Sequence, residues 1–184
     1  MKILAVDPDS AGGWALVSCD SVGALKIVSR SAVEGLAGCF AESPSSRAIY
    51  ALIRDLGHID VLVVEYVSLN RGTSVEVLRK LHEMAQRWVV VGELLVGDVA
   101  RIQPQAWRNA VGLPARGRKT GALKKAIRDI AARMTINIDP KKAALREKGL
   151  NPYQDSESDA VCMAVAYFLG QGKNLDQDTE GDKE

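Results

Sequence analysis

The chain has 184 residues, of which 47% are hydrophobic and 26% charged, and its formal net charge is +1 at pH 7. This composition is typical of one ordinary soluble globular domain. Cys19, Cys39 and Cys162 are odd in number, widely spaced and without a Cys-x-x-Cys pair, which argues against a disulfide framework or a zinc site. No apolar run approaches membrane-spanning length, and we expect a cytoplasmic protein.

The first predicted strand spans residues 2–6 and ends at Asp7. Its continuous apolar run fits a strand buried on both faces, and the Gly12-Gly13 pair lets the chain fold back as a hairpin. Pro8 disfavours the helical region for the residue before it, so Asp7 stays extended at the end of the sheet. On this stretch alone, Asp7 is either a ligand or a solvated turn acid.

The next segments complete a predicted mixed sheet. Residues 24–31 alternate as a third antiparallel strand, residues 34–44 look like a connection, and a helix capped by Ser45 or Ser46 runs to about Leu56. Residues 61–65 form an apolar strand that ends in Glu65. A strand, a helix and a further strand imply a right-handed crossover and parallel pairing, so the fold class is α/β.

A long helix is predicted after a polar loop at residues 66–72. It begins at Thr73 or Ser74 and runs to about Val96, with one apolar stripe on the sheet and a second that is either core or a self-association face. The first stripe is Leu78, Leu81, Ala85, Trp88, Gly92 and Leu95, and the second is Val77, Met84 and Val91.

The remaining predicted elements follow the long helix. A short fifth strand covers residues 99–102, and residues 103–112, which hold Trp107 and Arg108, are left without an assigned element. A helix over residues 120–134 turns its apolar side inward and Lys124, Lys125 and Arg128 outward. Asp139-Pro140 can start a short basic helix, a last helix spans residues 155–169, and the acidic residues 171–184 are expected to be disordered.

Positive charge is concentrated in one part of the near-neutral chain. Between residues 101 and 148 the only acids are Asp129, Asp139 and Glu147. The cations there are Arg101, Arg108, Arg116, Arg118, Lys119, Lys124, Lys125, Arg128, Arg133, Lys141, Lys142, Arg146 and Lys148. Such a segment suits salt-sensitive binding to a phosphate backbone, and a solvated cationic face has the same composition.

Carboxylates stand at the ends of three predicted elements. Asp7 and Glu65 follow strands whose carboxyl ends share one edge of the sheet, while Asp155 and Asp159 lie four apart on one face of the last helix. Acids that converge without basic partners repel one another, and hard cations such as Mg²⁺ or Mn²⁺ relieve that repulsion. The alternative is that Asp155 and Asp159 only cap the last helix.

Taken in order, these residues resemble a known family. The run Leu4-Ala5-Val6-Asp7-Pro8-Asp9-Ser10, then Gly13-Trp14-Ala15-Leu16, Val63-Val64-Glu65 and Asp155-Ser-Glu-Ser-Asp159-Ala160 are similar to the RuvC-type Holliday junction resolvases of the RNase H-like superfamily. The resemblance spans residues 2–169. Many family members have Gly where Asp9 stands, and their last-helix acids are often three apart, so whether Asp155 or Glu157 completes the last pair stays open.

The resemblance implies an RNase H-like nuclease domain over residues 1–170 that acts on branched DNA. It implies a homodimer, formed through the helix at residues 74–96, that makes paired symmetric nicks in four-way junctions. Asp7 would be shared by two Mg²⁺ ions about 3.5–4 Å apart, with Glu65 on one side and Asp155 and Asp159 on the other, and Mn²⁺ would substitute. Lys119 matches a family lysine, here assigned to the scissile or an adjacent phosphate, or it is a solvated loop lysine.

The same resemblance suggests a DNA-binding surface. Tyr66 or Leu69 would probe the junction centre, although Tyr66 could instead close the core. The full predicted set is Tyr66, Leu69, Asn70, Arg71, Arg108, Arg116, Arg118, Lys119, Lys124 and Lys125. The alternatives are another RNase H-like nuclease acting on hybrids or flaps, a sugar-kinase-like ATPase, for which the chain is too short, and a catalytically inactive junction-binding module.

Overall fold

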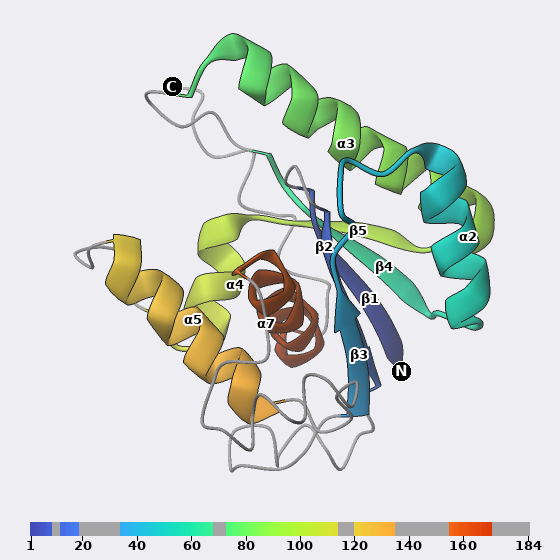
Figure 1. The fold of residues 1–184 in the computed structure, drawn as a ribbon. Coiled ribbons are helices and arrows are strands. Elements are labelled where there is room, and N and C mark those ends of the chain that lie inside the picture. Colours follow the sequence, from blue (N-terminus) through green and yellow to red (C-terminus); the bar gives the residue numbers. More distant parts are fainter. Residues whose placement is uncertain (9–11, 19–33, 68–72, 114–119, 135–154, 171–184) are drawn as a thin grey trace, which may run out of the picture.

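The computed structural model describes residues 1–8, 12–18, 34–67, 73–113, 120–134 and 155–170 (Figure 1). The strand predicted at residues 24–31, the short basic helix after Asp139 and the acidic tail at 171–184 lie outside the described residues, so those expectations stay predictions.

The described strands form one mixed sheet in the order β3-β2-β1-β4-β5. The central strand β1 (Lys2–Asp7) pairs antiparallel with β2 (Gly13–Ser18), which pairs antiparallel with β3 (Glu34–Gly38). On its other side β1 pairs parallel with β4 (Val61–Glu65), and β4 pairs parallel with β5 (Val99–Ile102). The predicted fold class, an antiparallel three-stranded meander joined to two parallel strands, is confirmed. The third described strand of the meander is β3 at residues 34–38, whereas the prediction placed it at residues 24–31.

The prediction that residues 34–44 are only a connection is wrong, because β3 lies at their start. Its sequence, Glu-Gly-Leu-Ala-Gly, lacks the β-branched residues that mark a strand. Packing explains the strand instead: a Cβ added to Gly38 would lie 2.8 Å from Trp14 Cζ2, so the glycine lets the indole of β2 cover its partner strand. The strand β3 therefore depends on a tertiary contact, which the local sequence does not reveal.

Helices cover both faces of the sheet. Successive strand residues point to opposite sides, so Leu4 and Val6 pack beneath α2 (Ser46–Leu56) and α3 (Val75–Leu95). Ile3 and Ala5 pack on the other side against α7 (Asp155–Leu169). Figure 1 shows α2 and α3 on one side of the sheet and α7, with α5 beside it, on the other.

Serine caps fix the starts of α2 and α3, the two helices on one face of the sheet, and a close contact fixes α3 against the sheet. Ser45 Oγ accepts a hydrogen bond from the Ala48 amide at 3.2 Å, and Ser74 Oγ accepts one from the Val77 amide at 3.3 Å. A Cβ added to Gly92 would lie 2.2 Å from Leu62 Cδ2, so this glycine lets α3 approach the sheet. The predicted starts of both helices are confirmed.

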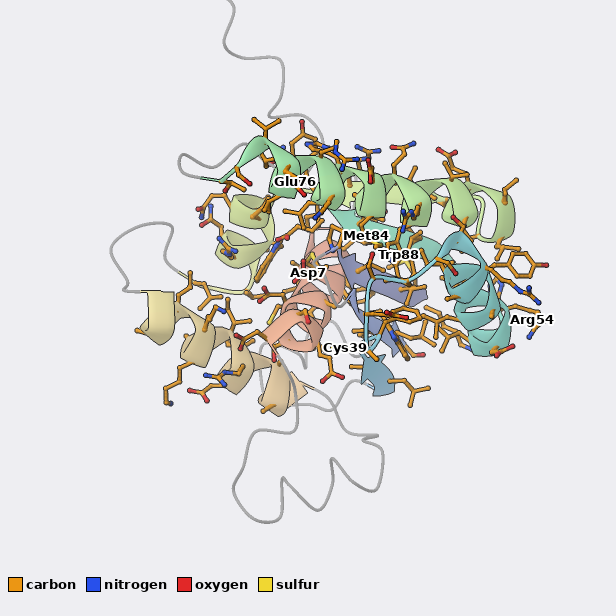
Figure 2. The ribbon with its side chains drawn as sticks, turned by 45° about the horizontal axis from the view of Figure 1, so that its top comes forward. Asp7, Cys39, Arg54, Glu76, Met84 and Trp88 are labelled. Carbon is orange, nitrogen blue, oxygen red and sulfur yellow. The ribbon has the colours of Figure 1, made fainter. Side chains whose placement is uncertain are left out.

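The second apolar stripe of α3 belongs mostly to the core. Met84 and Val91 are buried with Trp88, whereas Val77, the first member of that stripe, stays 47% exposed. Leu95, the last member of the first predicted stripe, is also exposed. Val75, Val90 and Leu94 are exposed apolar side chains of the helix that belong to neither predicted stripe. Figure 2 shows Met84 and Trp88 between α3 and the sheet.

The helices on the other face of the sheet, α4, α5 and α7, include one that had no predicted counterpart. α4 (Pro104–Ala110) begins with a proline, which suits a first helical position, and buries Trp107 completely. α5 (Thr120–Met134) and α7 begin and end where predicted. Among the described residues, no helix combines the length and the apolar character needed to cross a membrane.

Candidate active site

Asp7 and Glu65 lie side by side at one edge of the sheet. They are the last residues of β1 and β4, which are parallel neighbours with Val6 opposite Val64. By alternation both side chains belong to the face that α7 covers, and both residues are partly buried. The prediction that two strand-end carboxylates share an edge is confirmed, and their common face is that of α7.

The first turn of α7 lies against the same edge because β2 begins with a glycine. Gly13 is opposite Asp7 in the antiparallel ladder, and a Cβ added to it would lie 2.4 Å from the Ser156 carbonyl carbon. A cavity of about 130 Å³ opens there, with Asp7 beside α7 in Figure 2. Its lining residues are Asp7, Lys124, Ile127, Asp155, Ser156 and Asp159.

The partly buried Asp159 links this cavity to Glu65. Its pKa rises from 3.8 to about 7, first because burial disfavours the carboxylate and next because the negative charge of Glu65 repels it. Arg108 acts in the opposite direction, Asp155 adds to the rise, and Lys124 again lowers the pKa. The structure thus brings Asp7, Glu65, Asp155 and Asp159 together at one edge of the fold.

Asp155 has basic partners, which the sequence reasoning did not foresee. Lys124 Nζ lies 2.8 Å from Asp155 Oδ2, and Arg128 Nε lies 3.5 Å from Oδ1. The premise that these acids converge without Lys or Arg partners is therefore wrong for Asp155. One turn of α5 separates the two cations, so both reach α7. The hydrogen bond to Asp155, and then the negative charge of that carboxylate, raise the pKa of Lys124.

Glu157, the other acid in the first turn of α7, has a different setting. It is only 3% exposed and does not line the cavity. Of the two acids left open by the sequence, Asp155 is the one beside Asp7 and Asp159.

Trp107 contacts Glu65 directly. Its indole Nε1–H donates a hydrogen bond of 2.7 Å to Glu65 Oε1, and Arg108 Cζ lies 5.0 Å from the centroid of the indole ring. Trp107 was not among the predicted site residues. No local pattern reveals this contact, because the two residues are 42 positions apart and meet only when β4, β5 and α4 are in place.

The predicted DNA-binding residues fall into two groups. The first group lies within the described residues and includes Tyr66 and Lys125. The Tyr66 side chain is 37% exposed, and its backbone amide donates a hydrogen bond of 2.8 Å to the Ile102 carbonyl. Lys125 is exposed and forms an ion pair of 2.8 Å with Asp129. The exposure of Tyr66 does not support the alternative that it closes the core. Leu69, Asn70, Arg71, Arg116, Arg118 and Lys119 lie outside the described residues.

The donors at this edge suit a hard divalent cation in kind. Carboxylate oxygens are the ligands that Mg²⁺ and Mn²⁺ prefer. Burial first, and then the negative charge of Glu65, raise the pKa of Asp159 at this edge. Within the part of the chain that the structure describes, no three or more His, Cys, Asp or Glu side chains are already grouped to hold a metal. Lys124 and Arg128 contact Asp155, and Trp107 contacts Glu65.

Comparison with known proteins first defines the class of fold. No family model and no curated protein matches the sequence. The five-stranded mixed sheet with helices on both faces is an RNase H-like α/β fold, which solved structures share.

Particular solved structures match almost the whole chain. Thermus thermophilus RuvC matches with a TM-score of 0.58 at 13% identity, over 95% of this chain and 98% of that one. Thermus thermophilus RuvC in complex with a Holliday junction substrate matches with a TM-score of 0.59 at 14% identity, over the same shares. The yeast mitochondrial Holliday junction resolvase matches with a TM-score of 0.52 at 11% identity, over 92% of this chain and 78% of that one. The resemblance to RuvC-type resolvases is thus confirmed at the level of the fold.

Proposed function

We propose that the protein is a divalent-metal-dependent endonuclease that resolves four-way DNA junctions. The observation that carries this proposal is the meeting of Asp7, Glu65, Asp155 and Asp159 at one edge of an RNase H-like sheet. The same fold occurs in Thermus thermophilus RuvC in complex with its Holliday junction substrate, which supports junction DNA as the substrate.

The four carboxylates would hold two Mg²⁺ ions, with Mn²⁺ as a substitute. When bound, such ions supply an activated water for in-line attack on the phosphodiester and stabilise the leaving oxygen. Asp159 must lose its proton to serve as a ligand, and a pKa of about 7 means that it does so near neutral pH.

The basic side chains around the cavity suit a phosphate backbone. Lys124 lines the cavity, and Arg108 is close enough to Asp159 to lower its pKa. Both therefore bring positive charge to the acidic edge, where an approaching phosphate would otherwise be repelled. Lys119 remains our proposal for a contact with the scissile or an adjacent phosphate.

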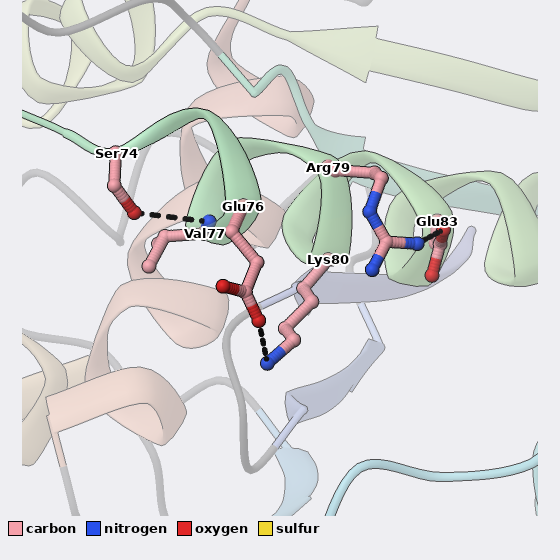
Figure 3. A network of polar contacts seen from close by, with 6 residues as sticks. All are labelled: Ser74, Glu76, Val77, Arg79, Lys80 and Glu83. Atoms are coloured by element: carbon pink, nitrogen blue, oxygen red, sulfur yellow. Dashed lines mark hydrogen bonds and ion pairs between the residues drawn. The ribbon is translucent and has the colours of Figure 1, made fainter.

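The exposed side of α3 is our proposed homodimer interface. Val90 and Leu94 are four residues apart, hence on one face, and are 46% and 77% exposed. Nearer the N-terminus, Glu76 pairs with Lys80 and Arg79 with Glu83, so this half of the helix presents both signs of charge (Figure 3). A two-fold enzyme suits a junction that offers two equivalent strands. Sedimentation equilibrium of wild type and Leu94→Glu tests the interface: a dimer that becomes a monomer supports it, and a wild-type monomer contradicts it.

Cleavage of synthetic DNA tests the proposed activity. A four-way junction, a linear duplex, a flap and an RNA:DNA hybrid of matched sequence are each incubated with Mg²⁺, with and without a chelator. We expect paired symmetric nicks in the junction alone, lost with the chelator. Preferential cleavage of the hybrid or flap would indicate another RNase H-like nuclease, and binding without nicking in Mg²⁺ and Mn²⁺ would indicate an inactive junction-binding module.

A further inference from the structure

Trp107 holds one of the acids at the sheet edge through a single directional contact. Its Nε1–H donates to Glu65 Oε1 over 2.7 Å, and the indole itself is fully buried. An indole nitrogen can only donate, so this bond favours the charged carboxylate and restricts rotation of the Glu65 side chain.

The surroundings of Trp107 make it a rigid support. The residue packs in the core layer between the sheet and α7 with Ile102 and Leu113. Its amide donates to the Gln103 carbonyl at 3.2 Å, and the Leu113 amide donates to the Arg108 carbonyl at 2.8 Å, so hydrogen bonds tie both ends of α4. A side chain anchored in this way orients what it touches.

The same indole also contacts Arg108, the cation that lowers the pKa of Asp159 most. The Arg108 guanidinium carbon lies 5.0 Å from the ring centroid, within the range of a cation–π contact. Among the described residues, Arg108 Nε is buried without a hydrogen-bond partner. Trp107 thus touches an acid with its edge and a cation with its face.

We infer that Trp107 is a positioning residue that acts through Glu65, setting the carboxylate in the orientation in which it binds a divalent cation. The inference rests on the proposed metal site. Hydrogen bonds from residues behind a metal ligand fix the ligand's orientation, and removing them lowers metal affinity by roughly 10- to 100-fold. Trp107 therefore contributes to metal affinity without touching the metal.

Trp107→Phe is the direct test, because it keeps an aromatic ring in the core and under Arg108 while removing the indole N–H. Trp88→Phe is the matched control: Trp88 is also fully buried, packs edge-on to Phe40, and has no hydrogen-bond partner for its Nε1 among the described residues. Free Mn²⁺ is measured by electron paramagnetic resonance at constant protein concentration. We expect Mn²⁺ affinity to fall about 10- to 100-fold in Trp107→Phe and to stay at the wild-type level in Trp88→Phe.

A double-mutant cycle shows whether Trp107 acts through Glu65. In a Glu65→Gln background, Trp107→Phe should cause little further loss of Mn²⁺ affinity, because the ligand that it orients has already lost its charge. Equal losses in both backgrounds, or equal affinity in Trp107→Phe and wild type, would overturn the inference.

Indole N–H resonances give a readout that needs no Trp107 variant. In ¹H–¹⁵N spectra of the wild-type chain, the signals of Trp14 and Trp88 are identified with Trp14→Phe and Trp88→Phe, and that of Trp107 follows by elimination. We expect Mg²⁺ to shift the Trp107 signal most strongly, and an unmoved Trp107 signal at saturating Mg²⁺ would contradict the inference. If the wild type neither binds Mn²⁺ nor nicks a junction, the proposed function itself fails, whereas normal wild-type binding with an unaffected Trp107→Phe variant rejects only the role of Trp107.

Discussion

Gly13 of β2 lies so close to Ser156 of α7 that a Cβ in its place would be 2.4 Å from the Ser156 carbonyl carbon. Gly13 is also the ladder partner of Asp7. The absence of one side chain therefore lets the helix that carries Asp155 and Asp159 reach the strand that carries Asp7.

Gly13→Ala should push α7 away from the sheet edge. The clashing atom belongs to the backbone of α7, which can shift only together with the helix. Overpacking of this kind lowers the free energy of unfolding by roughly 1–3 kcal/mol or more. We expect a lower free energy of unfolding in urea and weaker Mn²⁺ binding. Gly121→Ala is the control, because a Cβ at that exposed position in α5 meets nothing within 4 Å. Equal stability and equal Mn²⁺ affinity of Gly13→Ala and wild type would contradict this role of the glycine.

The sequence predicts the parts of the fold that depend on local patterns. The apolar runs of β1 and β4, the capping serines Ser45 and Ser74, and the period of α5 each carry their own signal, and these elements lie where expected. The strand β3 does not, because its glycines and alanine have low strand propensity and it depends on packing against Trp14.

The candidate site shows the same division. Strand ends predict that Asp7 and Glu65 share an edge, and helix spacing predicts that Asp155 and Asp159 share a helix face, because those rules follow from backbone geometry. That the two pairs meet is what the family resemblance implies. The contacts of Trp107 with Glu65 and of Lys124 with Asp155 depend on how α4 and α5 dock beside α7. Docking of separate helices leaves no periodic trace in one sequence.

Asp7→Asn should separate DNA binding from cleavage. The amide keeps the size of the side chain but removes the negative charge that Asp7 contributes to the four carboxylates. We expect junction binding in a chelator to be unchanged and Mg²⁺-dependent nicking to fall by about 100-fold or more, the scale on which removal of an electrostatic group from an active site acts. Binding is measured by gel shift and nicking on a labelled junction. Cleavage by the variant at the wild-type rate would reject the assignment of Asp7.

Asp159 should make the metal-free protein less stable as the pH rises. Its folded-state pKa of about 7 lies above the ordinary value of 3.8, so between these values the folded protein holds a proton that the unfolded chain has released. The contribution of Asp159 to the free energy of unfolding is therefore most favourable below about pH 4 and is lost as the pH rises through 7.

The variant Asp159→Asn removes that dependence. In a chelator at about pH 8 it should be more stable than wild type by at most ~4 kcal/mol, given 1.36 kcal/mol for each unit of pKa. The difference should shrink towards zero near pH 4, as followed by urea unfolding at each pH. A difference that is the same at both pH values would show that the pKa of Asp159 is not raised.

Lys124→Gln should change metal and DNA binding in opposite directions. Lys124 is paired with Asp155 at 2.8 Å and lines the cavity, so its charge competes with a divalent cation for that carboxylate. We expect a several-fold gain in Mn²⁺ affinity, weaker junction binding, and a salt dependence reduced by about one phosphate contact. Lys125→Gln is the control for Mn²⁺ binding, because Lys125 is paired with Asp129 and does not line the cavity. Loss of Mn²⁺ affinity in Lys124→Gln would contradict the competition.

The most direct measurement is anomalous X-ray scattering from crystals of the protein soaked in Mn²⁺. If the sheet edge is a metal centre, anomalous peaks should lie among Asp7, Glu65, Asp155 and Asp159, and should weaken or vanish in Asp7→Asn crystals soaked in the same way. Crystals of the wild type that bind Mn²⁺ elsewhere, with no peak among these carboxylates, would contradict the proposed two-metal nuclease.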